Sequence, residues 1–136
     1  MIKQADDVKS DNPVNDKPAD AVDWSVLDDL KVLQKPGKPD LRIKLMTVFL
    51  TSMPALMDTI KSSVTARDAP ALMDAAHAMK SSSLSLGAMV FGNTCSELEQ
   101  LGRAKTLDDA PALLSRAENE FTAVCSAFSD DLEQNR

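Results

Sequence analysis

The sequence has little of what a β-rich protein needs. Of its 136 residues only 4% are aromatic, tyrosine is absent, and 4 are glycine. Leucine, alanine, methionine and valine supply most of the apolar content, and no segment alternates with period two for long enough to form a strand. The composition therefore favours helices over sheets. A chain of this length is expected to form one domain that buries its core without metals or disulfides.

Basic clusters and long apolar runs are also missing. The formal net charge is -6, and an acidic chain without a basic cluster is a poor candidate for binding nucleic acid or an anionic membrane. No apolar run reaches the roughly 20 residues of a membrane span. The first residues, MIKQADDVKS, lack the apolar segment of a signal peptide. We therefore expect a cytoplasmic protein whose partners are other proteins, or small molecules at a local site.

Most catalytic and cofactor sites are excluded in the same way. His77 is the only histidine, and Cys95 and Cys125 form no CxxC pair, so we expect no metal site and two reduced, packed thiols. No glycine-rich loop is present that could hold the phosphates of ATP. No orienting group or oxyanion hole accompanies a Ser-His or Cys-His pair. We expect no cofactor on this chain.

Apolar residues spaced by three and four predict a series of helices. Residues 1–22 are polar, contain proline and show no such period, which indicates a disordered leader or an interdomain linker. Residues 23–136 are expected to form the helical domain. A short helix near residues 24–33 should stop at Lys35-Pro36-Gly37. The later helices should begin near Asp40, cover 65–87 and 88–102, and begin again near Thr106.

These helices predict the fold class. Short connections make neighbouring helices antiparallel, so we expect an all-α, up-and-down four-helix bundle with a short additional N-terminal helix. Pro54 lies inside the second predicted helix, which begins near Asp40, and it should cause a kink or a local break there. Gly92 lies inside the fourth predicted helix and indicates a close helix crossing. No long two-helix seam demands a dimer, and we expect a monomer.

His77 is predicted to lie on the accessible face of its helix. At roughly 100° per residue, Leu72, Ala76, Met79, Ser83 and Leu86 form the core stripe, and His77 lies about 140° away from Leu72. Lys80 lies one turn beyond the histidine. Met73 and Leu84 are expected to flank the imidazole as an exposed apolar patch suited to docking a partner.

One accessible imidazole can act as a nucleophile at neutral pH. Attack on a phosphoryl group would produce phosphohistidine, and Lys80 could offset the incoming negative charge. A partner would have to deliver the phosphoryl group. The ordinary alternatives are a solvated surface histidine, a surface lysine, and a helix end weakened by three successive serines.

The stretch AHAMKSSSLSLGA resembles the signature of histidine-containing phosphotransfer (HPt) domains. That signature has a histidine, a lysine three residues on, small residues next, and an apolar-glycine pair about ten residues after the histidine. The matching residues here are His77, Lys80, Ser81, Ser82, Leu86 and Gly87. The downstream CSELEQLGRA is similar to the following helix of the family, with Leu98, Glu99 and Gly102 in its usual places. Together the resemblance covers roughly residues 24–132.

The resemblance implies a function. A response-regulator receiver domain, with Mg²⁺ bound to the receiver, would transfer a phosphoryl group from its aspartate to His77, and a second receiver would accept it. Ser81, Ser82, Met73, Leu84 and Glu99 would belong to the partner-binding surface. The family usually has glycine where this chain has Ser81, which leaves room for the partner beside the imidazole. The linker-like leader leaves open a stand-alone protein or a module of a hybrid sensor kinase.

Two other classes of function remain open at the level of sequence. A non-catalytic helical adaptor would bind a partner through Met73 and Leu84, with His77 incidental. The other class is an enzyme, such as a phosphohistidine-dependent hydrolase or a histidine kinase dimerisation module. The dimerisation module also presents a histidine, but it usually places an acidic residue directly after it. Here that residue is Ala78, and no ATP-binding segment is present.

Overall fold

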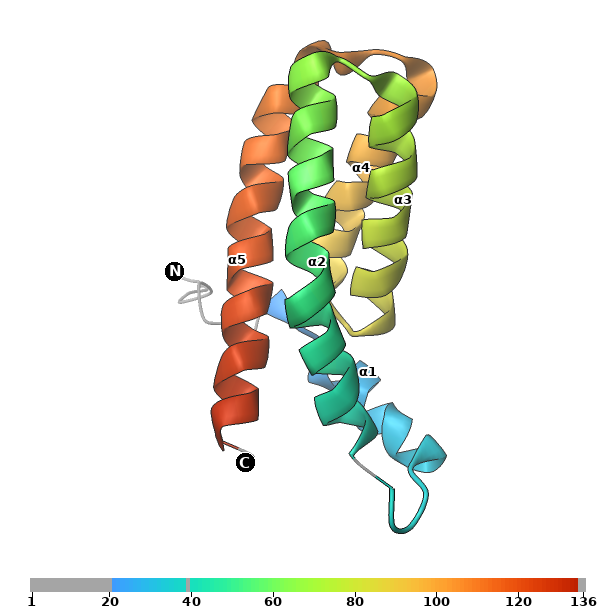
Figure 1. Ribbon diagram of the computed structural model, residues 1–136, viewed down its shortest axis with the longest axis vertical. Coiled ribbons are helices and arrows are strands. Elements are labelled where there is room, and N and C mark those ends of the chain that lie inside the picture. Colours follow the sequence, from blue (N-terminus) through green and yellow to red (C-terminus); the bar gives the residue numbers. More distant parts are fainter. Residues whose placement is uncertain (1–20, 39, 135–136) are drawn as a thin grey trace, which may run out of the picture.

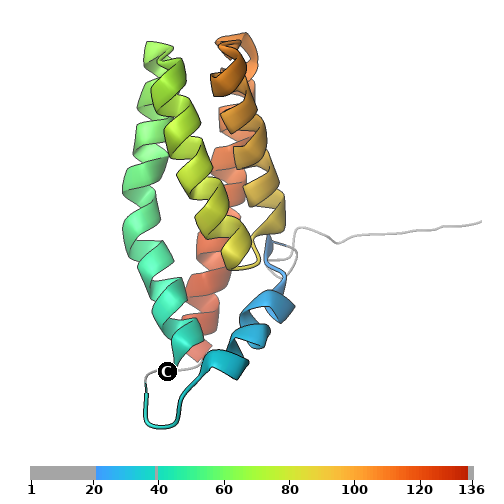
Figure 2. The same ribbon diagram turned by 90° about the vertical axis from the view of Figure 1, so that its right-hand side faces the viewer.

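The computed structural model describes residues 21–38 and 40–134, so residues 1–20 of the predicted leader lie outside the described part. Within the described ranges every regular element is helical, and the predicted all-α bundle is confirmed (Figures 1 and 2). Four long helices run antiparallel to their sequence neighbours, and the short α1 packs at one end. The elements are α1 (Trp24–Asp29), η2 (Leu30–Leu33), α2 (Leu41–Ala66), α3 (Ala69–Ser85), α4 (Met89–Ala104), η3 (Leu107–Asp109) and α5 (Ala110–Gln134).

Local capping explains where the central helices begin and end. The Asp40 carboxylate accepts from the backbone N–H groups of Arg42 and Ile43 at the start of α2. Asp68 caps α3 in the same way, because an aspartate side chain satisfies N–H groups that have no partner in the first turn. Gly87 ends the α3 region with φ +87, a conformation that glycine adopts without steric cost.

The predicted local break at Pro54 is wrong. α2 continues as one helix from Leu41 to Ala66, and Pro54 lies on its exposed side. The proline removes one backbone hydrogen bond there. Buried Phe49 and Met57 anchor the helix on both sides of it, so packing maintains the helical path through the proline.

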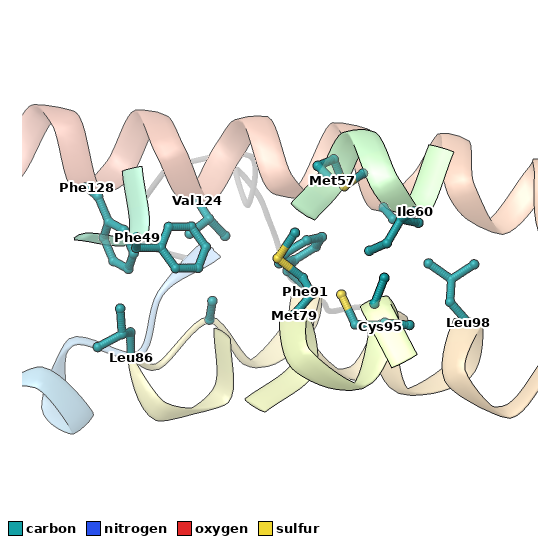
Figure 3. Close-up of a cluster of buried hydrophobic side chains, with 14 of the residues drawn as sticks. Phe49, Met57, Ile60, Met79, Leu86, Phe91, Cys95, Leu98, Val124 and Phe128 are labelled. Atoms are coloured by element: carbon teal, nitrogen blue, oxygen red, sulfur yellow. The ribbon is translucent and has the colours of Figure 1, made fainter. Parts of the chain in front are cut away.

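The few aromatic residues form one continuous chain of contacts through the core. Trp24 of α1 contacts Phe128 of α5, whose ring lies 5.2 Å from that of Phe49 on α2. Phe121 then joins Phe49 to Phe91 of α4, with ring centroids 6.0 and 5.4 Å apart. Figure 3 shows Phe49, Phe91 and Phe128 among the buried aliphatic side chains. All aromatic residues of the sequence thus belong to one row of contacts, which connects the short N-terminal helix α1 to the bundle.

The two cysteines are free thiols, as predicted. Cys95 is buried in α4, where desolvation, with a smaller contribution from the charge of Glu120, raises its pKa to about 12. Cys125 is half-buried in α5, and burial raises its pKa to about 11. Both thiols therefore stay protonated at neutral pH and are poor nucleophiles.

Close packing of α3 against α4 positions the functional site. A Cβ at Gly92 would lie 2.8 Å from Cγ of Leu84 and closer still to its Cδ2, which confirms the predicted close crossing. A Cβ at Gly102 would lie 2.8 Å from the backbone nitrogen of Met73. The two glycines let the helix backbones approach at two levels, so side chains between those levels can meet across the interface.

Among the described residues α2 alone combines the length and apolar composition of a membrane span, with a mean hydropathy of 1.3. Core helices of soluble proteins pass the same test. α2 places Met46, Phe49, Met57 and Ile60 in the bundle core, and 22% of its apolar window is buried.

Candidate functional site

His77 lies on the outer face of α3, as its helical position predicted. Its side chain is 60% exposed, whereas Leu72, Ala76, Met79 and Ser83 are buried in the core. The imidazole is therefore accessible to a partner, while the helix that carries it is fixed by the opposite face.

Glu99 of α4 lies directly beside the imidazole. Its carboxylate is only 3% exposed, and its Oε2 lies 2.9 Å from Nδ1 of His77. Glu99 is at the level between Gly92 and Gly102, where α3 and α4 approach closely. The helix packing therefore brings together two side chains that are 22 residues apart in sequence.

Glu99 is ionised at neutral pH. Its pKa is lowered from 4.5, mainly by contact with Lys80 and then by the hydrogen bond with His77, and these effects outweigh the opposing effect of desolvation. An ionised carboxylate accepts hydrogen bonds and donates none. Nδ1 of His77 must therefore carry the proton of this contact, which leaves Nε2 as the nitrogen with a free lone pair in the neutral ring.

Two cations share the same carboxylate. Nζ of Lys80 lies 2.7 Å from Oε1 of Glu99, in an ion pair without the angles of a hydrogen bond. Arg103, one turn along α4, donates from Nη2 to Oε2 over 2.8 Å. One buried carboxylate thus contacts an imidazole, an ammonium and a guanidinium group.

The other predicted site residues differ in how far their side chains are exposed. Ser81 is exposed one turn beyond His77, and Ser82 is half-buried. The expectation that Met73 and Leu84 form an exposed patch is wrong, because both side chains are half-buried. Leu84 leans into the space left by Gly92, and the backbone at Met73 packs against Gly102. Glu99, which was predicted to belong to the partner-binding surface, has its carboxylate buried against α3.

Arg103 is the site residue that sequence reasoning missed. Its spacing of four from Glu99 is the signature of a helical ion pair, and that signal is present in the sequence. The sequence does not show that this pair belongs to the site, because Glu99 lies beside His77 only in the folded structure. Within the described ranges no group of three or more His, Cys, Asp or Glu side chains is arranged to hold a metal ion.

The lowered pKa of Glu99 predicts a specific loss of stability in acid. A carboxyl group whose pKa is lower in the folded state stabilises the fold above its unfolded pKa, and this contribution is lost as the pH falls through the folded value. We expect the free energy of unfolding to decrease below about pH 5, and Glu99→Gln to reduce that decrease. Urea unfolding between pH 3 and pH 6 measures both.

The matched control for this titration is Asp108→Asn. Asp108 is 91% exposed and pairs with Arg67 on the surface. In Asp108→Asn the free energy of unfolding should therefore depend on pH as it does in the wild type. Equal pH dependence in Glu99→Gln and wild type would contradict the ionised, shared carboxylate.

Comparison with known proteins gives a consistent result. A family model described as the Hpt domain matches residues 44–127, a range that contains His77, Lys80, Glu99 and Arg103. The chain is also similar to the crystal structure of histidine-containing phosphotransfer protein B (HptB) from Pseudomonas aeruginosa PAO1. The identity is 30%, the match covers 87% of this chain and 99% of that chain, and the TM-score is 0.78. A comparison with curated proteins found no significant match. This chain therefore belongs to the Hpt domain family, the phosphocarrier modules of phosphorelay signalling.

Proposed function

We propose that His77 accepts a phosphoryl group from the aspartyl phosphate of one response-regulator receiver domain and passes it to the aspartate of another. The observation that carries this proposal is the exposed imidazole whose Nδ1 is held by the buried carboxylate of Glu99. Membership of the Hpt family supports the reaction class.

The hydrogen bond to Glu99 selects the attacking nitrogen. With the Nδ1 proton donated to Oε2, the lone pair on Nε2 attacks the phosphorus in line with the bond to the leaving aspartate oxygen. The N–P bond forms as the P–O bond breaks, and the aspartate leaves with the electron pair as a carboxylate. No proton needs to move in this step, since the Nδ1 proton stays where it is.

Glu99 also stabilises the charge that develops on the ring. Attack by a neutral imidazole leaves the ring positive while the Nδ1 proton is retained. A carboxylate 2.9 Å from that nitrogen stabilises the positive ring, as a buried aspartate does for the histidine of a serine protease. The contact is made before the reaction, so the carboxylate needs no reorganisation during it.

Lys80 is proposed to lower the cost of bringing the phosphoryl group to His77. It is one turn from the imidazole on α3, and its side chain is 24% exposed, so its positive charge is only partly screened by water. The side chain of Ser81 is small, so it leaves room for the receiver to dock beside the imidazole. The Mg²⁺ that neutralises the aspartyl phosphate is proposed to arrive on the receiver, and α3 and α4 supply a positioned nucleophile.

Phosphoryl labelling tests the proposal. We expect the chain to take up label from a phosphorylated receiver domain, and the label to be labile in acid and stable in base, as a phosphoramidate bond is. Label that is stable in acid would identify a hydroxyl acceptor such as Ser81, and the proposal would be wrong. Absence of label with a panel of receivers, under conditions in which HptB is labelled, would also contradict it.

A further inference from the structure

The cluster around Glu99 carries more positive charge than one carboxylate balances. Lys80 and Arg103 are both cations, and Glu99 is the acidic side chain that each contacts. With a neutral imidazole the cluster has a surplus of one positive charge, in a chain whose overall charge is -6. A positive surplus beside an exposed nucleophile is suited to an anion.

Phosphorylation of His77 would remove this surplus. A phosphoryl group brings two negative charges, and the ring that carries it becomes positive while Nδ1 keeps its proton. The phosphorylated cluster is then neutral only if both Lys80 and Arg103 are counted. Without Arg103 the same state would carry one uncompensated negative charge.

The helix geometry places the two cations on opposite sides of the imidazole. α3 and α4 are antiparallel, with Gly102 against Met73 and Gly92 against Leu84. Lys80 lies one turn from His77 toward the C-terminal end of α3. Arg103 is next to Gly102, so its backbone lies at the level of Met73, toward the N-terminal end of α3. A group attached to the ring can therefore be approached from both directions along the helix axis.

Of the two cations Arg103 is the one that is free to move. Its side chain is 58% exposed, whereas that of Lys80 is 24% exposed. When Arg103 moves away, the buried Glu99 carboxylate keeps its contacts with Lys80 and His77, so it is not left without a partner. A guanidinium group binds phosphoryl oxygens through two parallel hydrogen bonds.

We propose that Arg103 is a second phosphoryl-binding residue, which pairs with Glu99 while His77 is free and shifts to the phosphoryl group once His77 is modified. The inference rests on the proposed phosphorylation of His77. Arg103 and the imidazole share Oε2 of Glu99, so departure of Arg103 leaves that oxygen to the Nδ1 proton alone. One side-chain movement thus stabilises the negative phosphoryl group and the positive ring together.

The test uses the pH titration of the phosphoryl group itself. The chain is phosphorylated chemically with phosphoramidate, and its ³¹P signal is followed as the pH changes. Contact with a guanidinium favours the dianion, so Arg103→Gln should shift the titration midpoint to higher pH by about one unit relative to wild type. Arg103→Lys, which keeps the charge and loses the paired donors, should fall between them.

Arg116→Gln is the matched control. Arg116 is 51% exposed and pairs with Glu97 and Glu120 on the α4–α5 side of the bundle. Arg116→Gln should therefore leave the titration midpoint of the phosphoryl group unchanged. A midpoint in Arg103→Gln equal to that of wild type and of the control would overturn the inference. Chemical phosphorylation needs no receiver, so failure of receiver labelling would refute the proposed function while the role of Arg103 is still decided by this titration.

Discussion

Replacing His77 with glutamine is expected to abolish phosphoryl transfer to this chain while leaving the bundle folded. The described structure holds no second imidazole, because His77 is the only histidine of the sequence, and a glutamine amide has no nucleophilic lone pair of comparable strength. The side chain is 60% exposed, so the substitution removes little packing. Label uptake from a phosphorylated receiver and urea unfolding measure the two effects.

Ser115→Gln provides the matched control for that experiment. Ser115 is exposed on α5, and α5 packs against α2 and α4 rather than beside α3. The same new side chain is therefore placed on a helix surface away from the imidazole, and transfer should proceed at the wild-type rate. Residual acid-labile label on folded His77→Gln would refute His77 as the acceptor.

Replacing Glu99 with alanine is expected to slow transfer by on the order of 10- to 100-fold, which is the cost typical of a misplaced reacting group. The substitution removes the acceptor that holds the Nδ1 proton and the partner of Lys80 and Arg103. The ring then populates both tautomers and several orientations, and two cations lose their nearest negative charge. Single-turnover transfer from a phosphorylated receiver measures the rate.

Glu99→Gln separates the two contributions of the carboxylate. The amide oxygen can still accept from Nδ1, so the tautomer and ring orientation should be largely retained, whereas stabilisation of the positive ring is lost. We expect a rate between those of wild type and Glu99→Ala. The fraction of the Nδ1–H tautomer, measured by ¹⁵N NMR of the imidazole, should fall in the alanine variant and not in the glutamine variant. Wild-type rates in both variants would show that Glu99 has no part in the transfer.

The fold could be predicted well from local pattern. Apolar spacing predicted the long helices, and Asp40 and Gly87 lie close to the observed ends because capping and positive φ depend on individual residues. Pro54 shows the limit of this reasoning. A local rule predicted a kink or a break there, and the break is absent because packing of α2 on both sides of the proline maintains the helix.

The candidate site could be predicted only in part, since its main contacts cross between helices. The projection of α3 alone placed His77 correctly on the accessible side. The same projection left Met73 and Leu84 exposed, because it contained no neighbouring helix, and the space at Gly92 and Gly102 lets α4 cover part of both. The contact between Glu99 and His77 depends on that close approach, which no spacing within one helix encodes.

The central claim is that the chain relays a phosphoryl group, and a chase experiment tests it most directly. The chain is labelled by one phosphorylated receiver, separated from it, and mixed with a second, unphosphorylated receiver and Mg²⁺. The account predicts that label leaves His77 at a rate set by the second receiver and appears on that receiver's aspartate as base-labile acyl phosphate. Label that stays on the chain with every receiver tested, or leaves only as inorganic phosphate, would contradict the relay.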